Sequence, residues 1–156
     1  TDITIRSKNH FSFTLLAEGE NPLYDLTLSI YDHELAIAMA QIAGEKLLKS
    51  GKKLGLGAAN ESVKQIDIGN LPPNQSRQVY DFIFPEGALE RNFVVTIKAR
   101  NGQFRQPLKI NKEKAYFTIE STLENNGAVL KKIFEKKHPS KFHVPKNEIL
   151  DFSKEN

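Results

Sequence analysis

The chain has 156 residues, of which 39% are hydrophobic and 26% charged, and this composition is typical of a folded globular domain rather than of a disordered segment. It contains no cysteine, which excludes disulfides, thiolate metal sites and cysteine nucleophiles, and no apolar run approaches the ~18 residues of a membrane-spanning helix. The formal net charge is only +3 and just 5 of the 22 basic residues are arginine, so the arginine clusters of nucleic-acid-binding proteins are missing.

Two stretches near the N-terminus alternate apolar with polar residues, as half-buried strands do. They are residues 11–15 and 26–30. Between them, residues 18–22 read Glu-Gly-Glu-Asn-Pro, a composition that favours a turn. We therefore expect these two strands to pair with each other in an antiparallel arrangement.

A helix is predicted directly after the second strand. Apolar residues recur at helical spacing through an alanine-rich stretch, namely Leu35, Ala38, Met39 and Ile42. Asp32 is a suitable N-cap, Glu34 is favourable in a first turn, and Gly51 can end the helix. The sequence thus predicts one helix at about residues 33–50, inserted between strands.

The strongest β signal is the alternating run at residues 93–100, which is followed by Asn101-Gly102. Asn101 and Gly102 both tolerate the positive φ angles of a two-residue type I′ turn. The pattern predicts a hairpin that joins residues 93–100 to residues 104–110. Asn101 and Gly102 serve here as markers of the turn and of the fold, with no chemical role.

Further alternating stretches predict strands at residues 63–68, 78–84 and 116–123. The chain then has seven or eight strands joined mostly by short turns. This spacing predicts an all-β protein, an antiparallel β-sandwich that is immunoglobulin-like in a broad sense. A closed barrel is the structural alternative.

A second helix is predicted at about residues 126–137, with Asn125 or Asn126 as its cap and Pro139 just beyond its end. Four apolar residues form a stripe on it, Val129, Leu130, Ile133 and Phe134, beside the exposed lysines Lys131 and Lys132. The chain is accordingly divided into a sandwich domain, residues 1–124, and a C-terminal helix and arm, residues 125–156, packed on the sandwich.

Three short motifs occur in a fixed order along the chain: Asn21-Pro-Leu-Tyr-Asp25, Ile68-Gly-Asn-Leu71 and Ala99-Arg-Asn-Gly102. With them, residues 11–123 resemble bacterial β-sandwich modules of the immunoglobulin and fibronectin type III kind. The resemblance implies a domain that is attached to other domains in a larger protein. It implies no reaction and no catalytic residue, because the motifs are turns and a strand entry.

Residues that could support chemistry are scattered. The four histidines, His10, His33, His138 and His143, include no helical i, i+4 pair of the kind that binds zinc. The loop carboxylates Glu18, Glu20 and Asp25 could converge on a calcium ion at one end of a sandwich, although solvated charges are the favoured interpretation. We predict no catalytic residue, no metal and no cofactor.

By elimination, the sequence predicts a non-enzymatic protein-binding or assembly module of a larger bacterial protein. Its partner-binding residues are expected on the C-terminal helix: Val129, Leu130, Lys131, Lys132, Ile133 and Phe134. A helix that merely covers its own sandwich is the simpler alternative. The partner is a protein or a second copy, nucleic acid is not expected, and membrane contact is expected only through this basic helix.

The competing function is a carbohydrate- or small-ligand-binding sandwich, with or without calcium, in which exposed tyrosines stack on the ligand. The candidates are Tyr24, Tyr31, Tyr80 and Tyr116. Because the chain begins at Thr1 rather than at Met, we expect upstream residues, and an extracytoplasmic location stays open.

Overall fold

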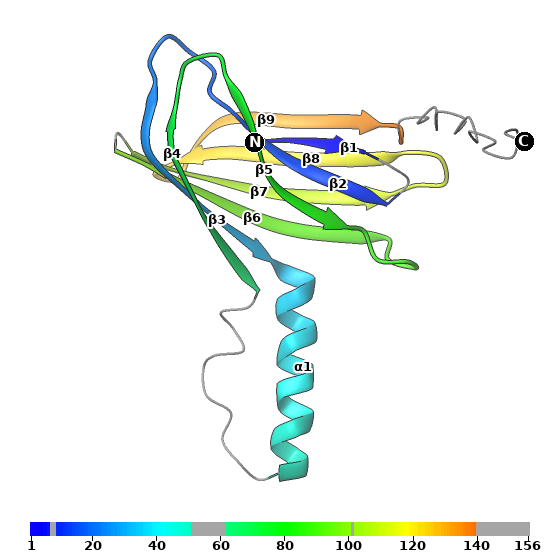
Figure 1. The fold of residues 1–156 in the computed structure, drawn as a ribbon. Helices are drawn as coiled ribbons and strands as arrows, with labels where there is room; N and C mark the ends of the chain where they lie inside the picture. The colour runs from blue at the N-terminus through cyan, green and yellow to red at the C-terminus, as the bar shows by residue number, and fades with distance from the viewer. Residues whose placement is uncertain (7–8, 51–61, 101, 140–156) are drawn as a thin grey trace, which may run out of the picture.

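The computed structural model describes residues 1–6, 9–50, 62–100 and 102–139, which form nine strands and one helix (Figure 1). In chain order these are β1 (Asp2–Ile5), β2 (His10–Leu16), β3 (Leu23–Asp32), α1 (His33–Ser50), β4 (Val63–Leu71), β5 (Ser76–Ile83), β6 (Glu90–Ala99), β7 (Gly102–Lys112), β8 (Phe117–Asn125) and β9 (Ala128–Lys137). A three-stranded sheet has the order β1-β2-β5, and a six-stranded sheet has the order β4-β3-β6-β7-β8-β9. All strand pairs are antiparallel, so the predicted all-β antiparallel architecture is confirmed.

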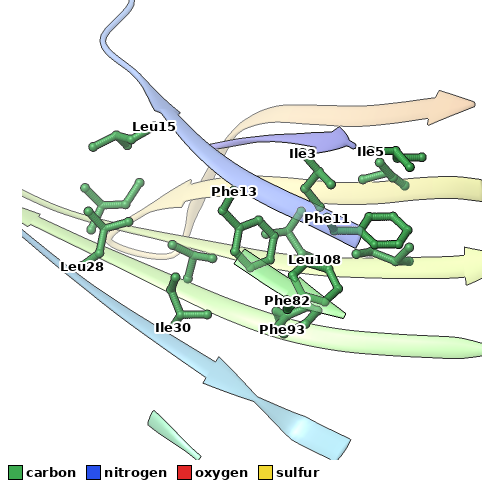
Figure 2. Close-up of a cluster of buried hydrophobic side chains, with 14 of the residues drawn as sticks. Ile3, Ile5, Phe11, Phe13, Leu15, Leu28, Ile30, Phe82, Phe93 and Leu108 are labelled. Carbon is green, nitrogen blue, oxygen red and sulfur yellow. The ribbon is translucent and has the colours of Figure 1, made fainter. Parts of the chain in front are cut away.

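The hydrophobic core lies between the two sheets, and phenylalanine rings from both sheets meet there (Figure 2). Phe11 on β2 meets Phe117 on β8 edge to face, with ring centroids 4.8 Å apart. Phe13 meets Phe93 on β6 in the same way, at 5.1 Å. Because such ring pairs contribute roughly 0.5–1.5 kcal/mol each beyond their buried area, the aromatic contacts hold the two sheets face to face.

The predicted pairing of residues 11–15 with residues 26–30 is wrong. β2 lies between β1 and β5 in the small sheet, whereas β3 lies between β4 and β6 in the large sheet. Alternation shows which face of a strand is buried, and both strands do bury one face, for example Phe13 on β2 and Leu28 on β3. Two buried faces can meet across a core as readily as side by side, however, and periodicity does not distinguish these arrangements.

The predicted hairpin at residues 93–110 is confirmed as β6 and β7, but its turn differs from the prediction. The two strands stay paired from Glu90 opposite Asn111 to Ala99 opposite Gly102. Gly102 is therefore the first residue of β7 and not a residue of the turn. Asn101 lies outside the described residues.

The predicted helix is confirmed as α1, which has the predicted bounds and the predicted cap. The backbone N–H of Leu35 donates a hydrogen bond of 3.0 Å to Oδ1 of Asp32. Tyr31 and Val63 lie opposite each other in the β3–β4 pair, so α1 belongs to an insertion in the loop of a hairpin. The helix projects away from both sheets, and none of the buried core residues that the structure describes belongs to it (Figure 1).

The predicted helix at residues 126–137 is wrong, because these residues continue the large sheet as strand β9. Asn126 and Gly127 have φ angles of +48° and +82°, and Asn125 pairs with Ala128 across them. Positive φ at both central positions is the signature of a type I′ hairpin turn, for which Asn-Gly is the preferred dipeptide. The turn therefore decides between strand and helix here. The predicted arm at residues 140–156 lies outside the described residues.

Candidate interaction surface

Strand β9 forms one edge of the six-stranded sheet (Figure 1). Among the described residues its only strand partner is β8, so the backbone N–H and C=O groups on its other side form no hydrogen bonds to a neighbouring strand. An edge of this kind is a template for another strand. Three large hydrophobic side chains on β9 are more than half exposed: Val129, Leu130 and Phe134.

The six residues predicted to bind a partner all lie on β9, but they do not form one stripe. Phe134 is opposite Glu120 and Lys132 is opposite Thr122, which places both on the outer face of the sheet, away from the core. Ile133 is opposite the buried Ser121, so it lies on the inner face together with Lys131. Successive side chains of a strand point to opposite faces, whereas the same spacing on a helix would have placed the apolar side chains on one face.

Lysine is the residue that most often protects an exposed edge, and β9 carries four of them. Three are engaged within the chain. Lys131 pairs with Glu18 at 3.6 Å, Lys136 lies 3.7 Å from the centre of the Tyr116 ring, and Lys137 pairs with Asp2 and Glu135 at 2.7 and 2.8 Å. Burial lowers the pKa of Lys137, but its hydrogen bonds to the two carboxylates raise that pKa above its ordinary value overall.

A groove of about 670 Å³ lies on the outer face of the large sheet, between the first residues of α1 and β9. Tyr31 and His33 line it at the helix end, Val94 and Pro107 form part of its floor, and Phe134 lines it at the β9 end. Lys109, Glu120 and Lys132 supply charge along the same surface. The sequence alone does not identify the floor residues Val94 and Pro107 as part of a site, although both lie at outward-facing positions of strands with alternating apolar and polar residues.

A network of buried and half-buried polar groups fixes the helix end of this groove. The buried carboxylate of Asp32 forms an ion pair with Arg91 of β6. The carboxylate of Glu34 accepts hydrogen bonds from the backbone N–H and from Nδ2 of Asn92, at 2.8 and 2.7 Å. On the small sheet, burial raises the pKa of Tyr80, and the charge of Asp32 raises it further against the opposing effect of Arg91. These contacts hold the first turn of α1 against β6.

The other residues considered for chemistry are dispersed over the surface. No group of three or more histidine, aspartate or glutamate side chains within the described part of the chain could hold a metal ion. Two of the three loop carboxylates that could have converged on a calcium ion are in ion pairs instead, Asp25 with Arg100 at 2.7 Å and Glu18 with Lys131. His143 lies outside the described residues. Of the four tyrosines, Tyr31 lines the groove, whereas Tyr80 stacks on Phe13 and Phe82 in the small sheet.

No protein-family model, no curated protein and no solved structure matches this chain. Across the ranges that the structure covers, no helix is long and apolar enough to cross a membrane. The segment through which membrane contact was expected is strand β9 in the structure and not a helix.

Proposed function

We propose that the chain is a non-catalytic binding or assembly module of a larger bacterial protein, immunoglobulin-like in a broad sense, and that it recognises another protein through β9 and the adjoining groove. The observation that carries this proposal is the side chain of Phe134, which is 69% exposed on an edge strand that has no second strand partner among the described residues. Strand addition to such an edge supplies backbone hydrogen bonds, and side chains beside the edge supply specificity.

The composition of β9 supports the same function. Monomeric proteins usually protect a long edge with free charges, prolines or bulges. The charge of Lys137 is already paired with Asp2 and Glu135 within the chain, and the regular part of β9 carries the exposed aromatic ring of Phe134 next to a groove. A partner strand would cover this ring and satisfy the open backbone groups.

The test is site-specific photo-crosslinking in the cells that produce the protein. A benzophenone amino acid replaces Phe134 in one variant and Ile83 in the other, since the two side chains are 69% and 70% exposed and lie on different sheets. We expect protein adducts from position 134 and none of comparable yield from position 83. Adducts of equal yield from both positions, or none from position 134, would contradict the proposal.

A second candidate function is the binding of a carbohydrate or another small ligand in the groove. The volume of the groove, about 670 Å³, lies within the range of roughly 300–1,000 Å³ that is typical of ligand pockets, and the rings of Tyr31 and Phe134 line the groove. Under this alternative, a glycan array would show binding that Tyr31→Ala abolishes, while adducts from position 134 would be absent.

A further inference from the structure

We propose that β9 pairs with β9 of a second copy of the chain, antiparallel and in one register, with Ile133 on the two-fold axis. This inference rests on the proposed function, because it names the protein that binds the β9 edge. It follows from the geometry of the edge and from the order of charges along it.

The part of β9 that can receive another strand is regular. From Lys131 to Lys137 its residues pair one to one with β8, and the only irregularity of the β8–β9 ladder lies at Leu123/Glu124, before this stretch. Within the described part of the chain, nothing pairs with the opposite side of residues 131–137. A second strand can therefore add to this side without any change in β9.

Symmetry restricts how two copies can meet at this edge. In an antiparallel pair, residues directly opposite each other lie on the same face of the sheet. A two-fold axis perpendicular to the sheet keeps the outer faces of both copies on one side. The axis must then pass midway between one residue and the same residue of the second copy, which lie directly opposite each other. Each possible register is thus defined by one central residue.

The charges of β9 select one of these centres. With Ile133 at the centre, Lys131 lies opposite Glu135 of the second copy, twice by symmetry, and Lys132 lies opposite Phe134. A centre at 131, 132, 136 or 137 places a lysine opposite itself, and a centre at 135 places Glu135 opposite itself. A centre at 134 places Lys132 opposite Lys136. Ile133 is the one centre in the regular stretch that places no like charges directly opposite each other.

Lys131 and Glu135 each have an ion-pair partner within one chain, Glu18 at 3.6 Å and Lys137 at 2.8 Å, but an ionised carboxylate such as Glu135 can accept hydrogen bonds from two lysines at once. The ion pair of Lys131 with Glu18 joins side chains that are 53% and 67% exposed, and such exposed pairs contribute little to stability. On the outer face, Phe134 would cover the aliphatic part of Lys132 from the second copy, and the reciprocal contact forms at the same time. The ring that is exposed in one chain would be covered in the pair.

The first test measures self-association of the purified chain by sedimentation velocity from low micromolar to submillimolar concentration. Lys131→Glu and Glu135→Lys each replace two attractions by two repulsions, so each is expected to raise the dimer dissociation constant roughly 10- to 100-fold. The double variant with both changes restores opposite charges across the axis and should restore the dimer. Contacts within one chain cannot explain such a rescue, because the glutamate introduced at position 131 would still face Glu18 there.

Lys64→Glu is the matched control, since it makes the same change on β4, the other edge of the same sheet, and should leave the dissociation constant unchanged. Circular dichroism melting of every variant establishes that it is folded. Failure of the double variant to restore the dimer, or an equal effect of Lys64→Glu, would overturn the proposed register.

The second test reads the register directly and uses the absence of native cysteine. Ile133→Cys should form a disulfide-linked dimer on mild oxidation, because the residue on the axis lies opposite its own copy within the Cα separation that a disulfide allows. Lys136→Cys should remain monomeric under the same conditions. A mixture of Lys132→Cys and Phe134→Cys should link the two different variants to each other.

The outcomes separate this inference from the proposed function. A chain that stays monomeric at all concentrations, while position 134 crosslinks to a different protein in cells, overturns self-pairing and supports the binding module. A monomeric chain with no adduct from position 134 contradicts both.

Discussion

Asp32 stabilises two elements at once, since it caps α1 and forms an ion pair with Arg91 of β6. Because its carboxylate is buried, removal of the arginine should leave a negative charge that no positive charge neutralises, with only the capping N–H of Leu35 as a hydrogen-bond donor. We expect Arg91→Met to lower the free energy of unfolding by about 3 kcal/mol, measured by urea denaturation. In the double variant with Asp32→Asn most of this loss should disappear, because asparagine still caps the helix and the buried charge is gone.

Arg100 provides the control for this prediction. It pairs with Asp25, but the two side chains are 69% and 62% exposed, so water already solvates both charges. Arg100→Met should therefore cost no more than about 1 kcal/mol. Equal losses for the two arginine variants would mean that burial does not set the strength of the Asp32–Arg91 pair.

At the scale of the element, one substitution made at two glycines should have opposite effects. Gly127 has a φ angle of +82° in the β8–β9 turn, where a Cβ atom is strained, so Gly127→Ala should lower the unfolding free energy by about 1 kcal/mol. Gly44 lies inside α1, where an added Cβ atom would meet nothing beyond the helix backbone within 4 Å, so Gly44→Ala should raise the helix stability by about 1 kcal/mol.

The measurement is urea unfolding together with hydrogen exchange of the β9 amides, which should accelerate only in Gly127→Ala. Gly127→Ala should also weaken self-association, because a poorly formed turn destabilises β9, the strand with which the second copy pairs. If Gly127→Ala left both quantities unchanged, the turn would not determine the conformation of β9.

The elements differ in how well the sequence predicts them, and the reason lies in particular residues. α1 is predicted with its bounds because Asp32 and the alanine-rich spacing agree with each other. β9 is not, because Val129, Leu130, Ile133 and Phe134 have helical spacing and Asn126 is a good cap. The Asn126-Gly127 dipeptide was the available signal for a hairpin. The candidate partner-binding residues thus lie on a strand and not on the helix that their spacing predicted.

At the scale of the whole molecule, the positions of seven of the nine described strands, all but β1 and β9, were predictable, but the partition of strands between the two sheets was not. β2 and β3 are neighbours in sequence, yet they lie in different sheets, since residues 17–22 carry the chain from one layer to the other. The groove could not be predicted either, because its position depends on the order of the strands in the large sheet. It requires Tyr31, Val94 and Phe134 to share one face of three strands whose order the sequence does not reveal.

The sandwich should fold without α1. The core that the structure describes contains no residue of the helix, and the backbone N–H of Asp32 donates to the carbonyl of Ser62 at 3.0 Å, so the chain leaves and re-enters the sheet at adjacent points. Replacement of residues 33–61 by Asn-Gly would join β3 and β4 through a two-residue hairpin. The loss of the Glu34–Asn92 hydrogen bonds costs about 2 kcal/mol, and closure of a shorter loop offsets a similar amount.

The shortened chain should therefore unfold in one cooperative transition with a free energy within about 2 kcal/mol of the full chain. Its self-association should also persist, because β9 lies at the opposite edge of the sheet from the β3–β4 hairpin. Persistence of both properties would separate α1 from folding and from the β9 interface, and its exposed Leu35, Ile37 and Ile42 would then require a role of their own. A shortened chain that does not fold would instead make the first turn of α1 and its contacts with β6 essential to the sandwich.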